Sequence, residues 1–136
     1  MKLDVTAIEK AINSFGKAID QYGVDEENEF VRDSVIQRFE YSYELASKII
    51  KRYLSITSAD PSSINEMSFQ ELVREAYTKG ILKNSWDVWK KYRENRNRTS
   101  HGYNEEDAIE IAQNVQVFYG EVQFLLKKLE EYNKRI

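Results

Sequence analysis

The stretch AIEIAQNVQVFYGEVQFLLKKLEEY, residues 108–132, decides the fold class. Its apolar residues recur at alternating intervals of three and four positions, and the repeat consists of Ala108, Ile111, Val115, Phe118, Val122, Leu125 and Leu129. This spacing places all seven side chains on one face of a long helix. Because such a face is stable in water only when it packs against other helices, the stretch predicts an all-α fold.

The first half of the chain repeats this pattern. Apolar residues at positions 5, 8, 12, 15, 19 and 22 predict a first helix that Gly23 ends. The acidic segment 25–29 is expected to open a second, long helix that runs to about Tyr53. The polar residues in its middle, Glu40 among them, are expected to serve solubility, although Arg38, Tyr41 and Tyr43 could also face a partner subunit. Residues 56–66 hold the only proline and several serines, so we predict a loop there.

The second half contains two further helix starts. Ser68 and Glu71 have the spacing of a capping box and predict a short helix that ends near Gly80. Another helix begins near Ser85 and leads into the basic segment at residues 90–98. The expected architecture is an antiparallel up-and-down four-helix bundle with one additional short helix, formed by residues 1–136 as a single domain.

Additional apolar residues on the last helix favour self-association. Ile109, Val117 and Leu126 widen its apolar face beyond what one neighbouring helix would cover. A homodimer would bury this surplus, so we predict that the protein is homodimeric.

Composition restricts the class of protein. The chain of 136 residues has no cysteine, so it has no disulfide framework, and a cytoplasmic location is expected. Lys2 and Asp4 interrupt any leader-like apolar run at the start, and no apolar stretch approaches the length of a membrane span. The net charge of -3 argues against polyanion binding by the whole surface. Five basic residues against two acids between positions 86 and 101 indicate either a local positive groove or a solvated helix face.

The segment RNRTSHGY, residues 96–103, contains the only histidine. Gly102 is predicted to end the preceding helix in the left-handed conformation, and Asn104 to cap the next one. On an unbroken helix, five residues would rotate His101 by roughly 140° away from Arg96. If the helix ends at Thr99 or Ser100, the imidazole can turn back towards the guanidinium.

Several kinds of site are absent from the sequence. One histidine and no cysteine leave too few ligands for a usual zinc site, and no Glu-x-x-His pair is present for a di-iron bundle. The glycine-rich motifs that hold nucleotide phosphates are missing, and so are the Gly-Ser and spaced aspartates of a catalytic nucleotidyltransferase. We therefore predict no metal and no cofactor.

Metal-free chemistry on RNA remains open to the segment. His101 could take the proton of a ribose 2′-hydroxyl, while Arg96 stabilises the charge that develops on the phosphorus. The alternative is structural, with His101 as a cation that satisfies the last carbonyls of its helix. Trp86 and Trp89, three residues apart, are more typical of a core than of a nucleobase platform.

Arg96-Asn97-Arg98-Thr99-Ser100-His101-Gly102-Tyr103 resembles the signature of the HEPN superfamily in its HepT-like group: an Arg, a polar residue, three more residues, a His, any residue and a Tyr. The stretches at residues 33–41 and 96–106 are similar to the branch called nucleotidyltransferase substrate-binding proteins. The similarity extends over nearly the whole chain.

The resemblance implies a homodimeric helical bundle that pairs with a small, separately encoded minimal nucleotidyltransferase. Under the toxin interpretation, Arg96 and His101 would be the catalytic residues of an RNase in a cleft between two protomers. Asn97 and Arg98 would support the site or bind the substrate, and Tyr103 would accept AMP from a silencing antitoxin. Under the alternative, the same groove would hold a nucleotide or an acceptor substrate of the nucleotidyltransferase, and nothing would be cut. A purely structural bundle is the third possibility.

Overall fold

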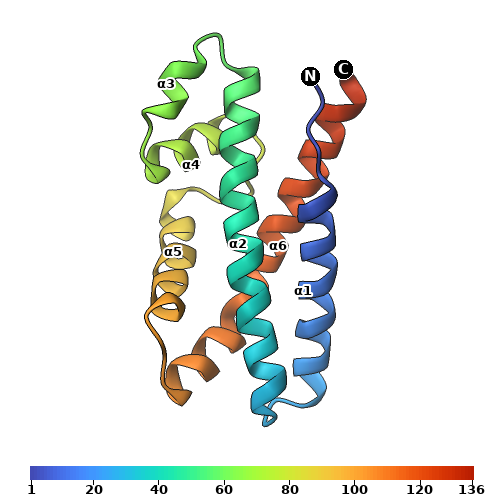
Figure 1. Cartoon of the computed structure of the whole chain (residues 1–136), viewed down its shortest axis with the longest axis vertical. Helices are drawn as coiled ribbons and strands as arrows, with labels where there is room; N and C mark the ends of the chain where they lie inside the picture. Colours follow the sequence, from blue (N-terminus) through green and yellow to red (C-terminus); the bar gives the residue numbers. More distant parts are fainter.

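The computed structural model describes residues 1–136, which form six α-helices and no strands, so the all-α prediction is confirmed. Helices α1 (Thr6–Val24), α2 (Glu29–Thr57) and α6 (Glu105–Arg135) are long and contact one another. Helix α5 (Trp86–Ser100) lies on the side of α2 away from α1 (Figure 1). The four longer helices alternate in direction, and α2 lies between α1 and α5 in this view (Figure 1). No helix is both long enough and apolar enough to span a lipid bilayer.

Two short helices join α2 to α5. Helix α4 (Phe69–Thr78) begins with the predicted capping box, in which Ser68 and Glu71 exchange side-chain-to-backbone hydrogen bonds. Helix α3 (Pro61–Asn65) lies where a loop was predicted for residues 56–66. That prediction was wrong because proline is compatible with the first turn of a helix, and the buried Ile64 holds this turn against the core.

The predicted helix boundaries hold to within a few residues. Helix α1 continues through Gly23 to Val24, one residue beyond the predicted end, because Gly23 keeps a helical backbone and has no positive φ. The side chain of Asn28 accepts hydrogen bonds from two backbone N–H groups and starts α2. The acidic segment before α2 therefore contributes an asparagine cap in addition to its favourable charge.

Aromatic rings form the centre of the core. The ring centroids of Trp89 and Tyr92, both on α5, lie 6.0 Å and 5.0 Å from the ring centroid of Phe118 on α6. Trp89 is completely buried, which supports its interpretation as a core residue. Leu126 packs against this core within the chain, whereas Val117 is 59% exposed, so only part of the predicted apolar surplus is left uncovered.

Candidate functional site

A buried glutamate determines where α5 begins. Glu121 of α6 is fully buried, and its carboxylate accepts hydrogen bonds from the backbone N–H groups of Lys83 at 2.7 Å and Asn84 at 3.3 Å. It also accepts from the side-chain amide of Asn84 at 2.9 Å and from the hydroxyl of Tyr92 at 3.1 Å. These bonds tie the loop before α5, and α5 itself, to α6. They thereby orient the helix that carries the RNRTSHGY segment.

Helix α5 ends at the predicted place. Its last residue is Ser100, and His101 follows as the C-terminal cap with φ of -106°. Gly102 has φ of 81°, the left-handed conformation that was predicted for it. The side chain of Asn104 then accepts a hydrogen bond from the backbone of Asp107 and caps α6. The chain therefore turns sharply at His101, as an approach of this residue to Arg96 requires.

Arg96 faces α2. Its guanidinium lies 3.7 Å from the carboxylate of Glu40, and both side chains are less than one-third exposed. Glu40 was predicted to serve solubility, but here it forms an ion pair with the arginine. Burial raises the pKa of the neighbouring Tyr43 hydroxyl to about 12, although Arg93 and Arg96 act in the opposite direction. The cation of Arg96 therefore lies in the seam between α5 and α2.

His101 is exposed, and its imidazole makes no hydrogen bond or ion pair within the chain. The structural alternative required its imidazole to bond the last carbonyls of α5, and no such bond is formed. No hydrogen bond joins His101 to Arg96 either. The histidine is thus free to meet a ligand or a second protein surface at the end of α5.

The other residues of the segment point in different directions. Asn97 is exposed. Arg98 faces α6, where its guanidinium binds Asp107 at 2.7 Å and Glu110 at 3.3 Å. These carboxylates raise the pKa of Arg98 through their hydrogen bonds. Residues two positions apart on a helix are rotated by about 200° about its axis. Arg98 therefore lies on the side of α5 opposite Arg96, and its charge does not add to that of Arg96.

Tyr103 is 37% exposed and lines a small pocket of about 200 Å³ beside α2. Partial burial, together with the carboxylates of Asp33 and Glu40, raises the pKa of its hydroxyl. The same pocket is lined by Arg32, whose side chain is almost fully buried and whose Nε has no hydrogen-bond partner. Arg32 was not among the predicted site residues, because nothing in its neighbourhood in the sequence marks it as buried.

No group of three or more histidine, cysteine, aspartate or glutamate side chains is placed to hold a metal ion. The end of α5 thus offers one exposed imidazole, one guanidinium fixed by a carboxylate, and one accessible phenol. These groups can bind a phosphate, move a proton and accept a transferred group.

Comparisons with known proteins identify relatives of the whole chain. The family model described as nucleotidyltransferase substrate binding protein like matches residues 3–131. The chain is 30% identical to a Haemophilus influenzae protein named "Probable ribonuclease HepT", over 98% of this chain and 96% of that protein. It is also similar, with a TM-score of 0.85 and 28% identity, to a solved Haemophilus influenzae structure described as the fold of a substrate-binding domain of a nucleotidyltransferase. That similarity covers 93% of this chain and 99% of the other.

Proposed function

The chain belongs to the family of nucleotidyltransferase substrate-binding-like proteins, and on that premise we propose that it is a metal-independent endoribonuclease of the HepT type. In this proposal it is the toxin of a cytoplasmic pair whose antitoxin is a minimal nucleotidyltransferase. The observation that carries the proposal is the unpartnered imidazole of His101 at the end of α5, five residues after an arginine that forms an ion pair with Glu40. The relative named as a ribonuclease supports the same activity.

The reaction uses a nucleophile that RNA itself supplies. The imidazole of His101 takes the proton of a 2′-hydroxyl, and the 2′-oxygen then bonds to the adjacent phosphorus. Arg96 stabilises the additional negative charge on the phosphoryl oxygens. The bond from phosphorus to the 5′-oxygen breaks, the 5′-oxygen takes up a proton, and the products are a 2′,3′-cyclic phosphate and a 5′-hydroxyl. Since no step needs a metal, cleavage should persist in a chelator.

A second copy of the chain would complete the site. His101 is open to solvent in one chain, and a general base acts best where water is excluded. A homodimer in which the two α5 ends face each other would enclose both histidines and both arginines in one cleft. Measuring the molar mass in solution tests this part, and a monomer that cleaves RNA at full rate would contradict it.

The activity is tested by inducing the chain alone and by incubating the purified protein with RNA and a chelator. We expect growth arrest and products that end in a cyclic phosphate. His101→Ala should abolish both, with a rate loss of about 10²-fold or more. Ser100→Ala changes the preceding exposed residue and serves as the control. If wild-type chain leaves RNA intact, or if His101→Ala cuts as well as Ser100→Ala, the ribonuclease proposal is wrong.

Glu40→Gln tests the position of Arg96 separately. The substitution keeps the shape of residue 40 but removes the charge that lies 3.7 Å from the guanidinium. We expect cleavage to weaken mainly through a lower kcat, because a less well-held arginine meets the transition state less often. An unchanged kcat would show that the ion pair does not position Arg96.

We further propose that the partner nucleotidyltransferase silences the chain by adding AMP to Tyr103. The phenol loses its proton to solvent as its oxygen bonds to the α-phosphorus of ATP, the bond from this phosphorus to the oxygen that bridges to the β-phosphorus breaks, and pyrophosphate leaves. Intact-protein mass should rise by whole AMP units with partner and ATP, and Tyr103→Phe should prevent the rise. Because Asp33 raises the pKa of this phenol, Asp33→Asn should shift the pH profile of modification to lower pH. No shift would exclude this carboxylate as a determinant of reactivity.

A second candidate function is favoured by the family description and by the solved relative. Both refer to a substrate-binding protein of a nucleotidyltransferase. In that case the seam between α2 and α5 would hold a nucleotide or an acceptor substrate, and Arg96 would bind its phosphate. Calorimetric titration with nucleotides decides between the two functions: binding that Arg96→Gln abolishes, together with intact RNA, favours the binding subunit.

A further inference from the structure

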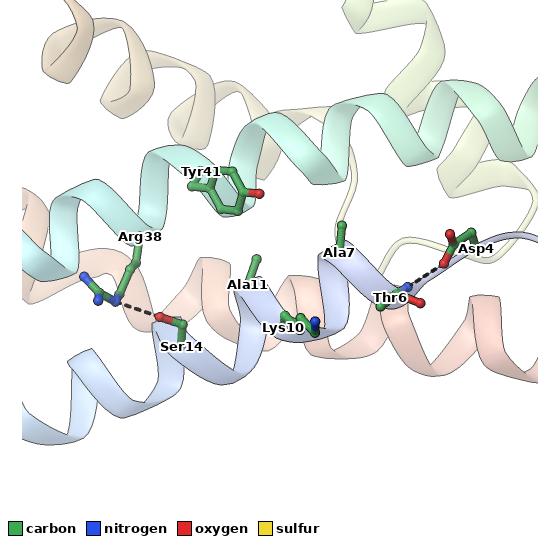
Figure 2. Close-up of a pocket in the computed structure, with 8 residues that line it drawn as sticks. All are labelled: Asp4, Thr6, Ala7, Lys10, Ala11, Ser14, Arg38 and Tyr41. Atoms are coloured by element: carbon green, nitrogen blue, oxygen red, sulfur yellow. Dashed lines mark hydrogen bonds between the residues drawn. The ribbon is translucent and has the colours of Figure 1, made fainter.

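A second polar groove lies on the other side of α2, away from α5. We name it the α1/α2 groove, and it is lined by Asp4, Thr6, Ala7, Lys10, Ala11, Ser14, Arg38 and Tyr41. Figure 2 shows Arg38 and Tyr41 projecting from α2 and the side chains of Lys10 and Ser14 from α1. Its volume of about 510 Å³ lies within the range of small-ligand pockets. None of the residues of the RNRTSHGY segment contributes to it.

The arginine of the groove is held by neutral groups. Nε of Arg38 donates to the hydroxyl of Ser14 at 2.8 Å, and Nη1 donates to the hydroxyl of Ser34 at 2.6 Å (Figure 2 draws the first bond). Its Nη2 makes no hydrogen bond, and Arg38 takes part in no ion pair. An arginine that is fixed in direction but not neutralised is suited to binding an anion.

A second cation lies across the groove, and acids are scarce. Lys10 of α1 forms no ion pair, and Ala7 and Ala11 beside it leave space at the floor of the groove. The one carboxylate in the lining, Asp4, lies at one end, where it accepts a hydrogen bond from the backbone N–H of Thr6. That bond lowers the pKa of Asp4. The lining therefore has a net positive charge, because the single carboxylate of Asp4 offsets only one of the two cations, Lys10 and Arg38.

The groove also has an aromatic face. Tyr41 follows Arg38 by three positions, so the two side chains are neighbours on α2. Tyr41 is 54% exposed and its hydroxyl makes no hydrogen bond within the chain, so the face of its ring is open to a ligand. A base can stack on such a ring while its phosphate meets the neighbouring cations, a combination that single-stranded nucleic-acid sites use.

We propose that the α1/α2 groove binds one nucleotide unit of a single-stranded RNA, with the phosphate between Arg38 and Lys10 and the base on Tyr41. This rests on the proposed function only in taking RNA as the substrate. Helix α2 lies between α1 and α5 (Figure 1). It alone separates the groove from Arg96, since Glu40 forms an ion pair with Arg96 of α5 and the next residue, Tyr41, lines the groove. A helix is about 10 Å wide, so a few nucleotides that cross its exposed ridge reach both places.

The test measures binding of a fluorescently labelled, single-stranded oligoribonucleotide with a 2′-O-methyl backbone to the full chain. This backbone lacks the internal nucleophile, so affinity is measured whether or not the protein cleaves RNA. We expect Arg38→Gln and Lys10→Gln each to weaken binding about tenfold and to lower the salt slope by about 0.7. Lys127→Gln, an exposed lysine of α6 outside the groove, is the control with the same change of charge.

Tyr41→Ala should also weaken binding about tenfold, and Tyr41→Phe should keep wild-type affinity because stacking needs only the ring. If Tyr41→Ala binds as wild type, recognition is by charge alone, as an acidic peptide would be recognised, and the nucleotide assignment is wrong. Lys10→Gln removes an exposed side chain that makes no hydrogen bond, so it stays informative if Arg38→Gln unfolds. If neither cation variant differs from Lys127→Gln, the groove is not an RNA site.

Discussion

Replacing Glu121 by Gln should destabilise the protein strongly although the two side chains have the same shape. The carboxylate accepts four hydrogen bonds in a site without solvent, from the backbone of Lys83, from the backbone and side chain of Asn84, and from Tyr92. A glutamine keeps one oxygen for the two backbone donors but turns an NH₂ group towards the other two. Hydrogen bonds to a charged group contribute about 1.5–3 kcal/mol each, so we expect a loss of about 3 kcal/mol in the free energy of unfolding.

Urea unfolding, measured at one protein concentration, gives this free energy for each variant. Tyr92→Phe removes one of the four donors and should lower the free energy by about 1.5 kcal/mol. The double variant should then be less destabilised than the sum, because both changes remove the same bond. Glu130→Gln, on the exposed side of the same helix, should stay within about 0.5 kcal/mol of wild type. Equal stability of Glu121→Gln and Glu130→Gln would refute the claim that this carboxylate holds α5.

Two further predictions concern packing and pH. A Cβ on Gly16 would overlap the phenol of Tyr119, so Gly16→Ala should lower the free energy of unfolding, measured by thermal denaturation, by about 1–3 kcal/mol. On the same helix a Cβ on Gly23 meets nothing within 4 Å, so Gly23→Ala should raise this free energy by about 0.5 kcal/mol. Equal effects of the two substitutions would contradict the predicted overlap. Folded Tyr43 keeps its proton to about pH 12 but the unfolded chain releases it near pH 10, so the folded state binds more protons between these values and stability should fall as pH rises, by up to about 3 kcal/mol. Denaturant titrations at several pH values between 10 and 12 should show that the free energy of unfolding of Tyr43→Phe falls less steeply with pH than that of the wild type. An equal fall in both proteins would exclude Tyr43 as its cause.

Local sequence patterns were sufficient for most of the fold. The apolar stripe at positions 108–129 predicted the longest helix, and the capping box at Ser68 and the left-handed Gly102 were predicted from residue types alone. Such features depend on hydrogen bonds and rotations within a few residues, so neighbours in the sequence contain the necessary information. Helix α3 was missed because its single turn is stabilised by the burial of Ile64, a contact with distant residues.

The candidate site likewise has features that the sequence predicts and features that only the structure shows. The sequence placed Arg96, His101 and Tyr103 near one helix end, and the structure adds which residues of α2 lie beside Arg96 and Tyr103. Glu40 was assigned to the surface because nothing nearby in sequence pairs with it, yet it forms an ion pair with Arg96. The burial of Glu121 could have been predicted from the sequence, since this residue interrupts the apolar face of the last helix directly before Val122.

The sequence by itself determined that this chain forms amphipathic helices, where most of them begin and end, and which short segment bears its reactive side chains. Periodicity and capping are properties of consecutive residues, and they need no knowledge of the packing. Only the tertiary structure decided which charges are neutralised and which are free. Arg98 is bound by acids of α6, whereas Arg38 across the bundle is held by serines and keeps its charge unpaired. The reason is that the electrostatic state of a side chain depends on groups close in space, and helix packing brings those together from distant parts of the chain.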